Sequence, residues 1–340
     1  MIEFEAQRGE RIVASAVADD FITYATAFNG KQIVSSITLA SVDGTEVQDS
    51  VVEVWITANG QDLTAKWSRA IGSIKAENIT IDDLGLSFST DAMLNIIEAQ
   101  VGELNLRVVS ADGKEDKFFW NVKVNSPDSW IRRSGRETIL AAFCQPQHPA
   151  IKEILASAGS RLKAKGLPVA WTGYQDPSTI DYMVEVIYEE MSSRQITYSL
   201  PEASWDIPGQ RIRNVGTILS DSTATCLDST LLFASCLEYI GLFPVVVVIP
   251  GHAFVGYWTK KFQDEFTYPT EPLRELGQVL NYVDLEYLVF FETTTICQDY
   301  QRDFDEAKLE PRARISSTDA INQPSDVSFV VDIVACRWPG

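Results

Sequence analysis

The sequence predicts an α+β protein in two parts, an antiparallel β-sandwich over residues 1–125 followed by a mixed domain of helices and strands over residues 126–340. Three observations favour this fold class. Short β-prone runs separated by turn residues fill the first part, and helical apolar spacing begins only after it. In the second part, a helix that is apolar on nearly all sides precedes two β-prone runs, a pattern typical of a helix buried against a sheet. With 340 residues, 45% of them hydrophobic, the chain is long enough to bury two cores.

The first part has the pattern of a sandwich built from many short strands. Its β-prone runs are RIVASAVA (11–18), QIVSSITLA (32–40), SVVEVWITA (50–58), LTAKWS (63–68), LNLRVVS (104–110) and FFWNVKV (118–124). Turn pairs such as Asn59-Gly60 and Asp112-Gly113 separate several of these runs, which favours an Ig-like sandwich; a β-rich subdomain of the second part is the alternative. The first part contains no histidine and no catalytic grouping, so its expected role is to position the second part or to present a binding face.

Helices follow the linker NSPDSW at 125–130. Residues 148–166 and 177–194 carry apolar side chains at helical spacing, and Pro177 marks the start of the second of these helices. We expect both helices to pack around the helix that begins at Cys226. The segment 196–213, which is rich in aromatic residues and prolines, is expected to wrap the cleft beside it.

Cys226 opens an apolar helix that we expect to end at Gly241. If the helix is buried with its first residue at the mouth of a cleft, Cys226 faces unpaired backbone N–H groups and the positive end of the helix dipole. Both favour the thiolate, so we expect its thiol pKa to lie below the free value of about 8.5. This position distinguishes it from the other cysteines, which are expected to be small buried apolar side chains: Cys144, Cys236, Cys297 and Cys336.

His252 and Glu292 are the candidate partners of Cys226. The chain has only two histidines, and His148, between prolines in QPQHPA, is expected to be a loop residue or a helix cap. His252 begins HAFVGYW, an alternating run that follows the predicted strand 244–250. Glu292 lies in a third predicted strand, 287–296. A cysteine nucleophile, a histidine base and a carboxylate that orients the histidine are therefore present in that chain order, although an exposed carboxylate at a strand end remains the alternative for Glu292.

These residues resemble the core of the transglutaminase-like superfamily of papain-like thiol enzymes. The family pattern is a Cys that opens a helix, a Gly-Leu/Ile-Pro turn, a His-Ala-Trp/Phe strand and an Asp-Pro-Thr strand end. The matching residues are Cys226, the turn 241–244, His252-Ala253-Phe254 and Glu292-Thr293-Thr294. Glu292 stands where the family has aspartate.

A narrower resemblance covers roughly residues 140–335. GQRIR (209–213), TCLDSTLLFASCLE (225–238) and GHAFVGYW (251–258) are similar to the transglutaminase-like module that precedes helicase and nuclease domains in large bacterial proteins. The resemblance implies protein partners or fused domains of this kind, in a larger system such as one of bacterial defence.

Two further side chains are candidates for the cleft. Gln210 could donate a hydrogen bond to an oxyanion, and Trp205 could line the cleft; a polar loop residue and a buried loop aromatic are the respective alternatives. No cysteine pair or His/Cys cluster has metal-ligand spacing, and we expect neither a metal nor a cofactor.

Composition excludes several classes of protein. The net charge is −19 and both parts are acidic, which disfavours direct binding of nucleic acid. The N-terminus MIEFEAQRGER is not a signal peptide, and no apolar run is long enough to span a membrane. Five irregularly spaced cysteines are typical of reduced thiols, so we expect a cytoplasmic protein.

Two functions follow from these observations. In the first, the chain is a cysteine peptidase or amidase that forms an acyl-enzyme on Cys226 from a protein or peptide substrate, with water as the default acceptor and an amine as the other possibility. In the second, it is a non-catalytic recognition module that works with helicase or nuclease domains.

Overall fold

The computed structural model describes residues 1–29, 32–167, 170–201, 209–259, 273, 275–324 and 327–337. The chain divides into two compact units, Met1–Ser129 and Trp130–Gly340. It is a mixed α+β protein with several sheets, as the sequence predicts.

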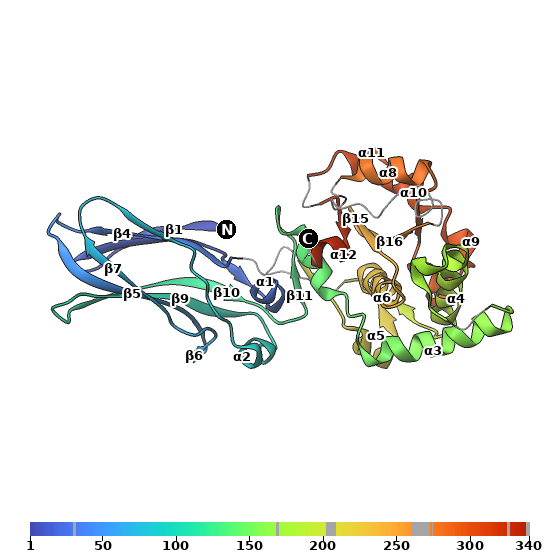
Figure 1. The fold of residues 1–340 in the computed structure, drawn as a ribbon, viewed down its shortest axis with the longest axis horizontal. Coiled ribbons are helices and arrows are strands. Elements are labelled where there is room, and N and C mark those ends of the chain that lie inside the picture. The colour runs from blue at the N-terminus through green and yellow to red at the C-terminus, as the bar shows by residue number, and fades with distance from the viewer. Residues whose placement is uncertain are drawn as a thin grey trace. The chain divides into compact units, whose positions relative to one another are not determined.

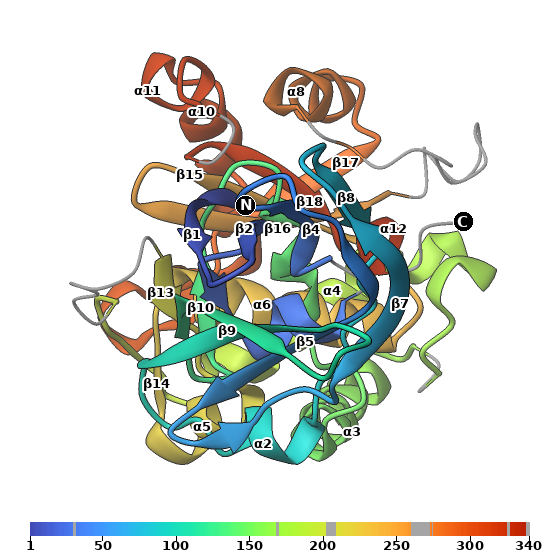
Figure 2. The ribbon, with the colours of Figure 1, turned by 90° about the vertical axis from the view of Figure 1, so that its left-hand side faces the viewer.

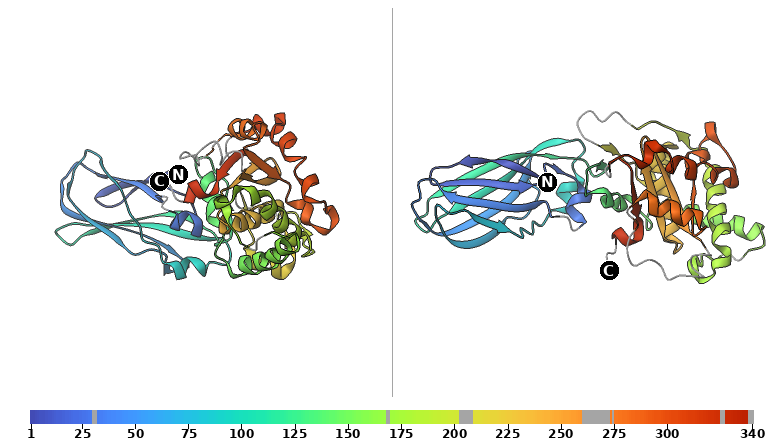
Figure 3. Two further views of the ribbon diagram at one scale, coloured as in Figure 1. Left: turned by 45° about the vertical axis from the view of Figure 1, so that its right-hand side comes forward. Right: turned by 90° about the horizontal axis from the view of Figure 1, so that it is seen from above.

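The first unit consists of two mostly antiparallel sheets that enclose one core, and they face each other in Figure 1. The first sheet has the order β1-β2-β4-β8: β1 (Ile2–Arg8), β2 (Ile12–Ala18), β4 (Val34–Ser41) and β8 (Ile79–Asp82). The second has the order β3-β10-β9-β5-β6, with β7 also paired to β5: β3 (Phe21–Ile22), β10 (Glu115–Val124), β9 (Gln100–Val109), β5 (Val47–Ala58), β6 (Gln61–Asp62) and β7 (Trp67–Ile74). The short helices are α1 (Tyr24–Phe28) and α2 (Thr90–Leu94). The long strands of this unit are seen from above in the right-hand view of Figure 3.

Period-2 alternation explains why the long strands face one core. Along β10, alternate residues are buried and the others exposed, so Phe118, Trp120 and Val122 all point inward. Asn59 and Gly60, both with positive φ, form the two-residue turn between β5 and β6, as an Asn-Gly pair predicts. This unit has strands that were not predicted, namely β1, β3, β6 and β8. The predicted run 63–68 is a strand only at its last two residues, which begin β7. β1 lacks the alternating pattern because both of its faces are largely exposed.

The second unit is built on a four-stranded antiparallel sheet with the order β17-β16-β15-β18. Its strands are β15 (Pro244–Ile249), β16 (His252–Trp258), β17 (Leu288–Phe291) and β18 (Phe329–Asp332). Helix α6 (Cys226–Tyr239) covers one face, together with α3 (Pro149–Ala164) and α4 (Ile180–Ser192). The other face is covered by α8 (Leu276–Asp284), α10 (Pro311–Ile315) and α11 (Thr318–Ile321), which lie above the sheet in Figures 1 and 2.

Burial on both faces explains the run PVVVVI in β15. Val246 and Val248 belong to the core shared with α6, and Val245 and Val247 belong to the core on the opposite face. A central strand that is covered on both sides needs no polar alternation, and every residue of β15 is buried. The helix α6 that packs on this sheet is buried from Cys226 to Leu237.

Shorter elements complete the second unit. They are β11 (Ser129–Ile131), β12 (Thr197–Tyr198), β13 (Gly209–Arg211), α5 (Val215–Asp221), β14 (Thr223–Ala224), α9 (Phe304–Ala307) and α12 (Ile333–Arg337), with 3-10 turns at Glu137–Phe143, Gly173–Gln175, Pro177–Thr179, Thr294–Ile296 and Gln298–Tyr300. Strand β11 pairs with β13, and β12 pairs with β14 in parallel.

Several predicted elements have different bounds in the structure. The predicted strand 287–296 ends at Phe291, and a 3-10 turn follows it. Strand β18 ends at Asp332, whose Oδ1 accepts a hydrogen bond from Ala335 N in α12. His148 is the N-cap of α3, as expected for a histidine before Pro149, and its Nδ1 accepts from Ala150 N.

Candidate functional site

Cys226 is the first residue of α6, as predicted. Thr225 caps this helix: its hydroxyl accepts from Asp228 N at 3.1 Å, and the Asp228 carboxylate accepts in return from Thr225 N at 2.9 Å. The cysteine side chain is nevertheless not open to solvent, because Cys226 is only 6% exposed. The capping box therefore fixes the first turn of α6, in which the Cys226 side chain is buried.

Asp228 also ties the start of α6 to the chain that follows β13. It is fully buried, and its carboxylate accepts from Arg213 N at 2.9 Å and from Arg213 Nη1 at 3.0 Å. With the bond from Thr225, the two carboxylate oxygens accept three hydrogen bonds, which makes the burial of this charge tolerable. Sequence reasoning treated Asp228 as part of the apolar helix and missed this connection; the Thr-x-x-Asp spacing at 225–228 was the available signal.

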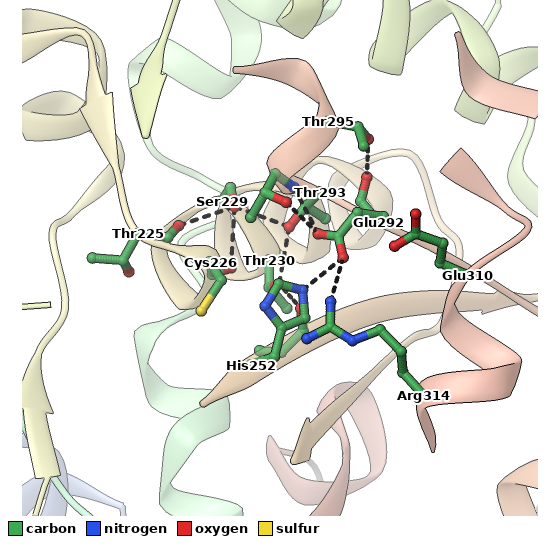
Figure 4. A network of polar contacts seen from close by, with 12 residues as sticks. Thr225, Cys226, Ser229, Thr230, His252, Glu292, Thr293, Thr295, Glu310 and Arg314 are labelled. Atoms are coloured by element: carbon green, nitrogen blue, oxygen red, sulfur yellow. Dashed lines mark hydrogen bonds and ion pairs between the residues drawn. The ribbon is translucent and has the colours of Figure 1, made fainter. Parts of the chain in front are cut away.

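His252 is the first residue of β16 and is 9% exposed. Its Nε2 lies 2.7 Å from Glu292 Oε2, and its ring packs against Phe254 with 4.7 Å between centroids. The other ring nitrogen, Nδ1, is turned toward the side of Cys226 in Figure 4. The next residue, Ala253, connects β16 directly to α6, because its carbonyl oxygen accepts from Thr230 Oγ1 at 3.3 Å. The strand start and the helix start are therefore held together.

Glu292 follows β17 and is buried, so the alternative of an exposed carboxylate at the strand end is wrong. Its Oε1 accepts from the backbone N–H of Thr294 at 2.9 Å and from the Thr294 hydroxyl at 2.7 Å, and its Oε2 faces His252. Burial raises the pKa of this carboxyl, but the hydrogen bond and charge of His252 and the donors of Thr294 outweigh burial and leave the pKa below the usual 4.5. Glu292 is thus ionised at neutral pH and able to orient the imidazole.

A cluster of buried hydroxyl groups backs the three candidate residues (Figure 4). Thr293 Oγ1 lies 2.9 Å from Ser229 Oγ and 3.2 Å from Thr230 Oγ1, both of which are on α6. The Ser229 hydroxyl also donates to the carbonyl oxygens of Thr225 and Cys226. These contacts join the loop after β17 to the first turn of α6, so the carboxylate and the cysteine belong to one packed unit.

Burial raises the pKa of the Cys226 thiol to about 11, and the Glu292 carboxylate raises it as well. The backbone N–H groups of Ala253 and Leu227 act in the opposite direction and do not offset burial. The expected pKa below that of a free thiol is therefore wrong. The helix start does supply N–H donors, but the sequence pattern could not show that the sulfur is removed from water.

Arg314 is a site residue that sequence reasoning missed. It lies on α10, and its Nη1 is 3.4 Å from the same Glu292 Oε2 that faces His252. Its guanidinium carbon is 5.2 Å from the centre of the Phe254 ring. No sequence signal placed Arg314 here, because it is 22 residues beyond Glu292 and on a short helix of the opposite sheet face.

Tyr198 is a second residue that was missed. Burial raises the pKa of its phenol, and Cys226 and Glu292 raise it further, which places the hydroxyl within electrostatic range of the site. Strand β12 brings it there by pairing Tyr198 with Ala224, two residues before Cys226. Tyr300 packs edge-on against it at 5.8 Å and is 55% exposed, so this aromatic pair extends from the site toward solvent.

The two remaining cleft candidates have different outcomes. Gln210 is in β13, and its Nε2 is buried without a hydrogen-bond partner among the residues that the structure describes. A buried donor of this kind is costly unless a ligand satisfies it, which is compatible with an oxyanion donor. Trp205 lies outside the described residues.

One cavity of the second unit is separate from the candidate residues. It has a volume of about 670 Å³ and is lined mainly by carboxylates and hydroxyls of α4, of residues 301–303 and of α9, including Tyr188. The Tyr188 hydroxyl donates to Thr295 Oγ1 at 2.7 Å. Neither Cys226 nor His252 lines this cavity. Within the described ranges, no group of three or more His, Cys, Asp or Glu side chains could hold a metal ion.

Comparisons with known proteins do not assign a family. No family model matches the chain, and no curated protein matches it. A solved structure of a candidate protease from Parabacteroides distasonis is 10% identical in sequence and has a TM-score of 0.24. The alignment covers 73% of this chain and 62% of the chain of that protein. A family 76 glycoside hydrolase from a Bacteroides thetaiotaomicron strain is 9% identical with a TM-score of 0.14, and 61% of this chain and 46% of that chain are covered. Neither similarity is high enough to support an argument about fold or activity.

No helix in the described part of the chain is both long enough and apolar enough to cross a membrane.

Proposed function

We propose that residues 126–340 form a transglutaminase-like cysteine peptidase or amidase, preceded by an Ig-like sandwich over residues 1–125. The observation that carries the proposal is the Cys226, His252 and Glu292 constellation. The His252 Nε2 to Glu292 Oε2 contact of 2.7 Å orients the ring, and Nδ1 is left for the cysteine at the start of α6. The order along the chain and the elements that carry the three residues are those of the family that the sequence resembles.

In this mechanism His252 acts first as a base. As Cys226 Sγ bonds to the carbonyl carbon of the substrate, the thiol proton passes to His252 Nδ1 and the carbonyl π electrons move to the oxygen. Backbone N–H groups at the start of α6 and Gln210 Nε2 are the proposed donors to this oxyanion. The C–N bond then breaks, and His252 returns its proton to the leaving amine.

Water completes the reaction in the second half. His252 removes a proton from water, the hydroxide attacks the thioester carbon, and the C–S bond breaks with return of the proton to sulfur. Nothing among the described residues marks a second, amine-binding subsite, so hydrolysis is proposed over cross-linking. Because the Cys226 pKa is about 11 in the free protein, proton transfer to His252 accompanies the attack instead of preceding it.

The raised thiol pKa and the 6% exposure of Cys226 favour a second candidate, a recognition module that has kept the fold without catalysis. In that case the chain would act through a protein partner, or through helicase and nuclease domains, in a cytoplasmic system. The acidic surface suits a protein partner better than nucleic acid.

Labelling with an acyl-type electrophile separates the two candidates. The protein would be incubated at neutral pH with peptide-based acylating probes, which form a thioester with a reactive cysteine. It would then be digested, and the modified cysteine would be identified by mass spectrometry. The enzyme proposal predicts modification at Cys226 that is lost in His252→Gln and retained in Cys236→Ala, a matched control in the same buried helix. Labelling that is equal in the wild type and in His252→Gln, or absent from Cys226 with every probe, would reject the enzyme and leave the recognition module.

A further inference from the structure

We propose that Arg314 is a positioning residue that shares the Glu292 carboxylate with His252 and so sets the pH at which the His252 ring takes up a proton. This inference deepens the proposed function and rests on it, since His252 is taken as the base.

The competition for one oxygen is visible in the hydrogen bonds of Glu292. Both donors of Thr294 bind Oε1, so that oxygen is committed to the loop after β17. Oε2 alone faces His252 Nε2, at 2.7 Å, and the same atom faces Arg314 Nη1, at 3.4 Å. A carboxylate that already neutralises a guanidinium stabilises an imidazolium less. The two cations therefore compete.

Phe254 holds Arg314 in this place. The guanidinium lies over the Phe254 ring at 5.2 Å, and the fully buried Phe254 ring also packs against the His252 ring. In Figure 4, Arg314 approaches Glu292 from the side of His252 that is turned away from Cys226. Arg314 thus reaches the carboxylate without blocking the histidine nitrogen that faces the cysteine.

The other ionisable groups around His252 do not supply this charge. Helix α6 contributes Cys226 and Asp228, strand β12 contributes Tyr198, and the loop after β17 contributes Glu292. Arg302 also interacts electrostatically with Glu292, but its ion pair is with Glu310, at 2.6 Å. Arg213 forms its ion pair with Asp228. Among the arginines and lysines that the structure describes, Arg314 forms the ion pair with Glu292, at 3.4 Å.

A Glu292 carboxylate that is shared in this way stabilises a protonated His252 ring less than an unshared carboxylate would. A neutral ring is what a base needs when the thiol beside it is protonated at neutral pH. Removal of the guanidinium charge should therefore raise the midpoint of the His252 titration.

The test is an NMR titration of the histidine rings in the full chain. His148 and His252 are the only histidines, so each variant gives two ring signals, and His148 at the start of α3 serves as the internal reference. In Arg314→Gln the His252 midpoint is expected to rise by about 0.5 to 1 pH unit, an ordinary charge effect reduced because the arginine side chain is partly exposed. Arg314→Lys keeps the charge and is expected to shift the midpoint less.

Arg312→Gln is the matched control. Arg312 is on the same helix and loses the same charge, but it pairs with Asp284 at 2.6 Å and does not contact Glu292. Its His252 midpoint should stay at the wild-type value. An unchanged midpoint in Arg314→Gln, or an equal rise in Arg312→Gln, would overturn the proposal.

Two features keep the result interpretable. If Arg314→Gln does not fold, Arg314→Met replaces it, because its apolar stem can still pack over Phe254. The titration also needs no substrate. If the protein has no hydrolytic activity, the proposed function is rejected, but a shift of the His252 midpoint would still support the role of Arg314. If the protein is active and the midpoint does not shift, only the role of Arg314 is rejected.

Discussion

At the scale of single residues, burial decides the state of the candidate nucleophile. Cys226 has the helix-start position that favours a thiolate, yet its pKa is raised to about 11 because the sulfur is removed from water beside a carboxylate. His252 and Glu292 differ in this respect, since they satisfy each other by a direct hydrogen bond. In the proposed mechanism, His252 is therefore a base that is oriented in advance, and Cys226 is a thiol that must be activated.

The pH dependence of alkylation should report this difference. In the free protein, the rate of Cys226 alkylation by iodoacetamide is expected to rise about tenfold per pH unit from pH 7 to 10, because only the thiolate reacts and the pKa is near 11. Peptide mapping by mass spectrometry at each pH gives the rate for this cysteine alone. A rate that reaches a plateau below pH 8 would show instead that the thiolate already forms at neutral pH.

Glu292→Gln should affect both activity and acid stability. Loss of the charge that orients His252 is expected to lower kcat/KM on a hydrolysed substrate by about 10² to 10⁴. Because the folded-state pKa of Glu292 is depressed, its ionised form stabilises the protein above pH 4.5, and this contribution is lost as the pH falls through the folded-state value.

Urea unfolding from pH 3 to 7 measures the second effect. The free energy of unfolding of Glu292→Gln should fall less steeply on acidification than that of the wild type. Glu153→Gln, which removes an exposed carboxylate on α3, is the control and should change the slope less than Glu292→Gln does. Identical slopes in Glu292→Gln and wild type would show that Glu292 is not depressed in the folded state.

At the scale of elements, the site depends on how β13, α6 and the loop after β17 are joined. Asp228 links Arg213 to Thr225, and Thr293 links the loop to Ser229. Gly209, at the start of β13, has no room for a side chain, because a Cβ there would collide with the carbonyl oxygen of Trp130. The strand that carries Gln210 is thereby held close to its neighbour.

Asp228→Asn should weaken this junction. The change keeps the side-chain size but removes the buried charge that accepts from Arg213 and Thr225, so we expect a loss of about 2 to 3 kcal/mol in the free energy of unfolding. Chemical denaturation monitored by circular dichroism measures it. Asp221→Asn, at the exposed end of α5, is the matched control and should change stability by less than about 0.5 kcal/mol. Equal effects of the two variants would contradict the proposed junction.

At the scale of the whole molecule, the chain has separate cores in its two units. Leu104 lies in the core of the first unit, and Phe233 lies in the core that α6 shares with the central sheet. Each buried cluster in the described part of the chain consists of residues of one unit.

Separate cores predict separate unfolding transitions. Leu104→Ala and Phe233→Ala should each cost about 3 to 5 kcal/mol, and each should lower the midpoint of a different transition in differential scanning calorimetry. The transition of the unaltered unit should keep its wild-type midpoint. A single transition that moves with both substitutions would mean that the two units unfold as one.

Local sequence patterns were sufficient to predict many of the strands and helices of this protein. Period-2 alternation predicted strands such as β2, β5 and β10, and the apolar helix from Cys226 and the strand from His252 begin where the sequence places them. The cysteine, histidine and carboxylate could be named as candidates because their chemistry and chain order are properties of the sequence itself. The end of β17, by contrast, was predicted too far along the chain, at residue 296 instead of Phe291. A Thr-rich run is found both in strands and in 3-10 turns such as the one that forms there.

Only the tertiary structure decided the electrostatics of the site. Arg314 and Tyr198 come from elements that are remote from Cys226 in the sequence. No rule of residue spacing predicts that Arg314 contacts Glu292, which lies 22 residues earlier in the chain. The degree of burial of Cys226 depends on everything packed around α6, so a helix-start position that favours the thiolate in isolation is overruled by the loss of water. Residue types and chain order are local information, whereas solvation and charge balance depend on which distant segments meet.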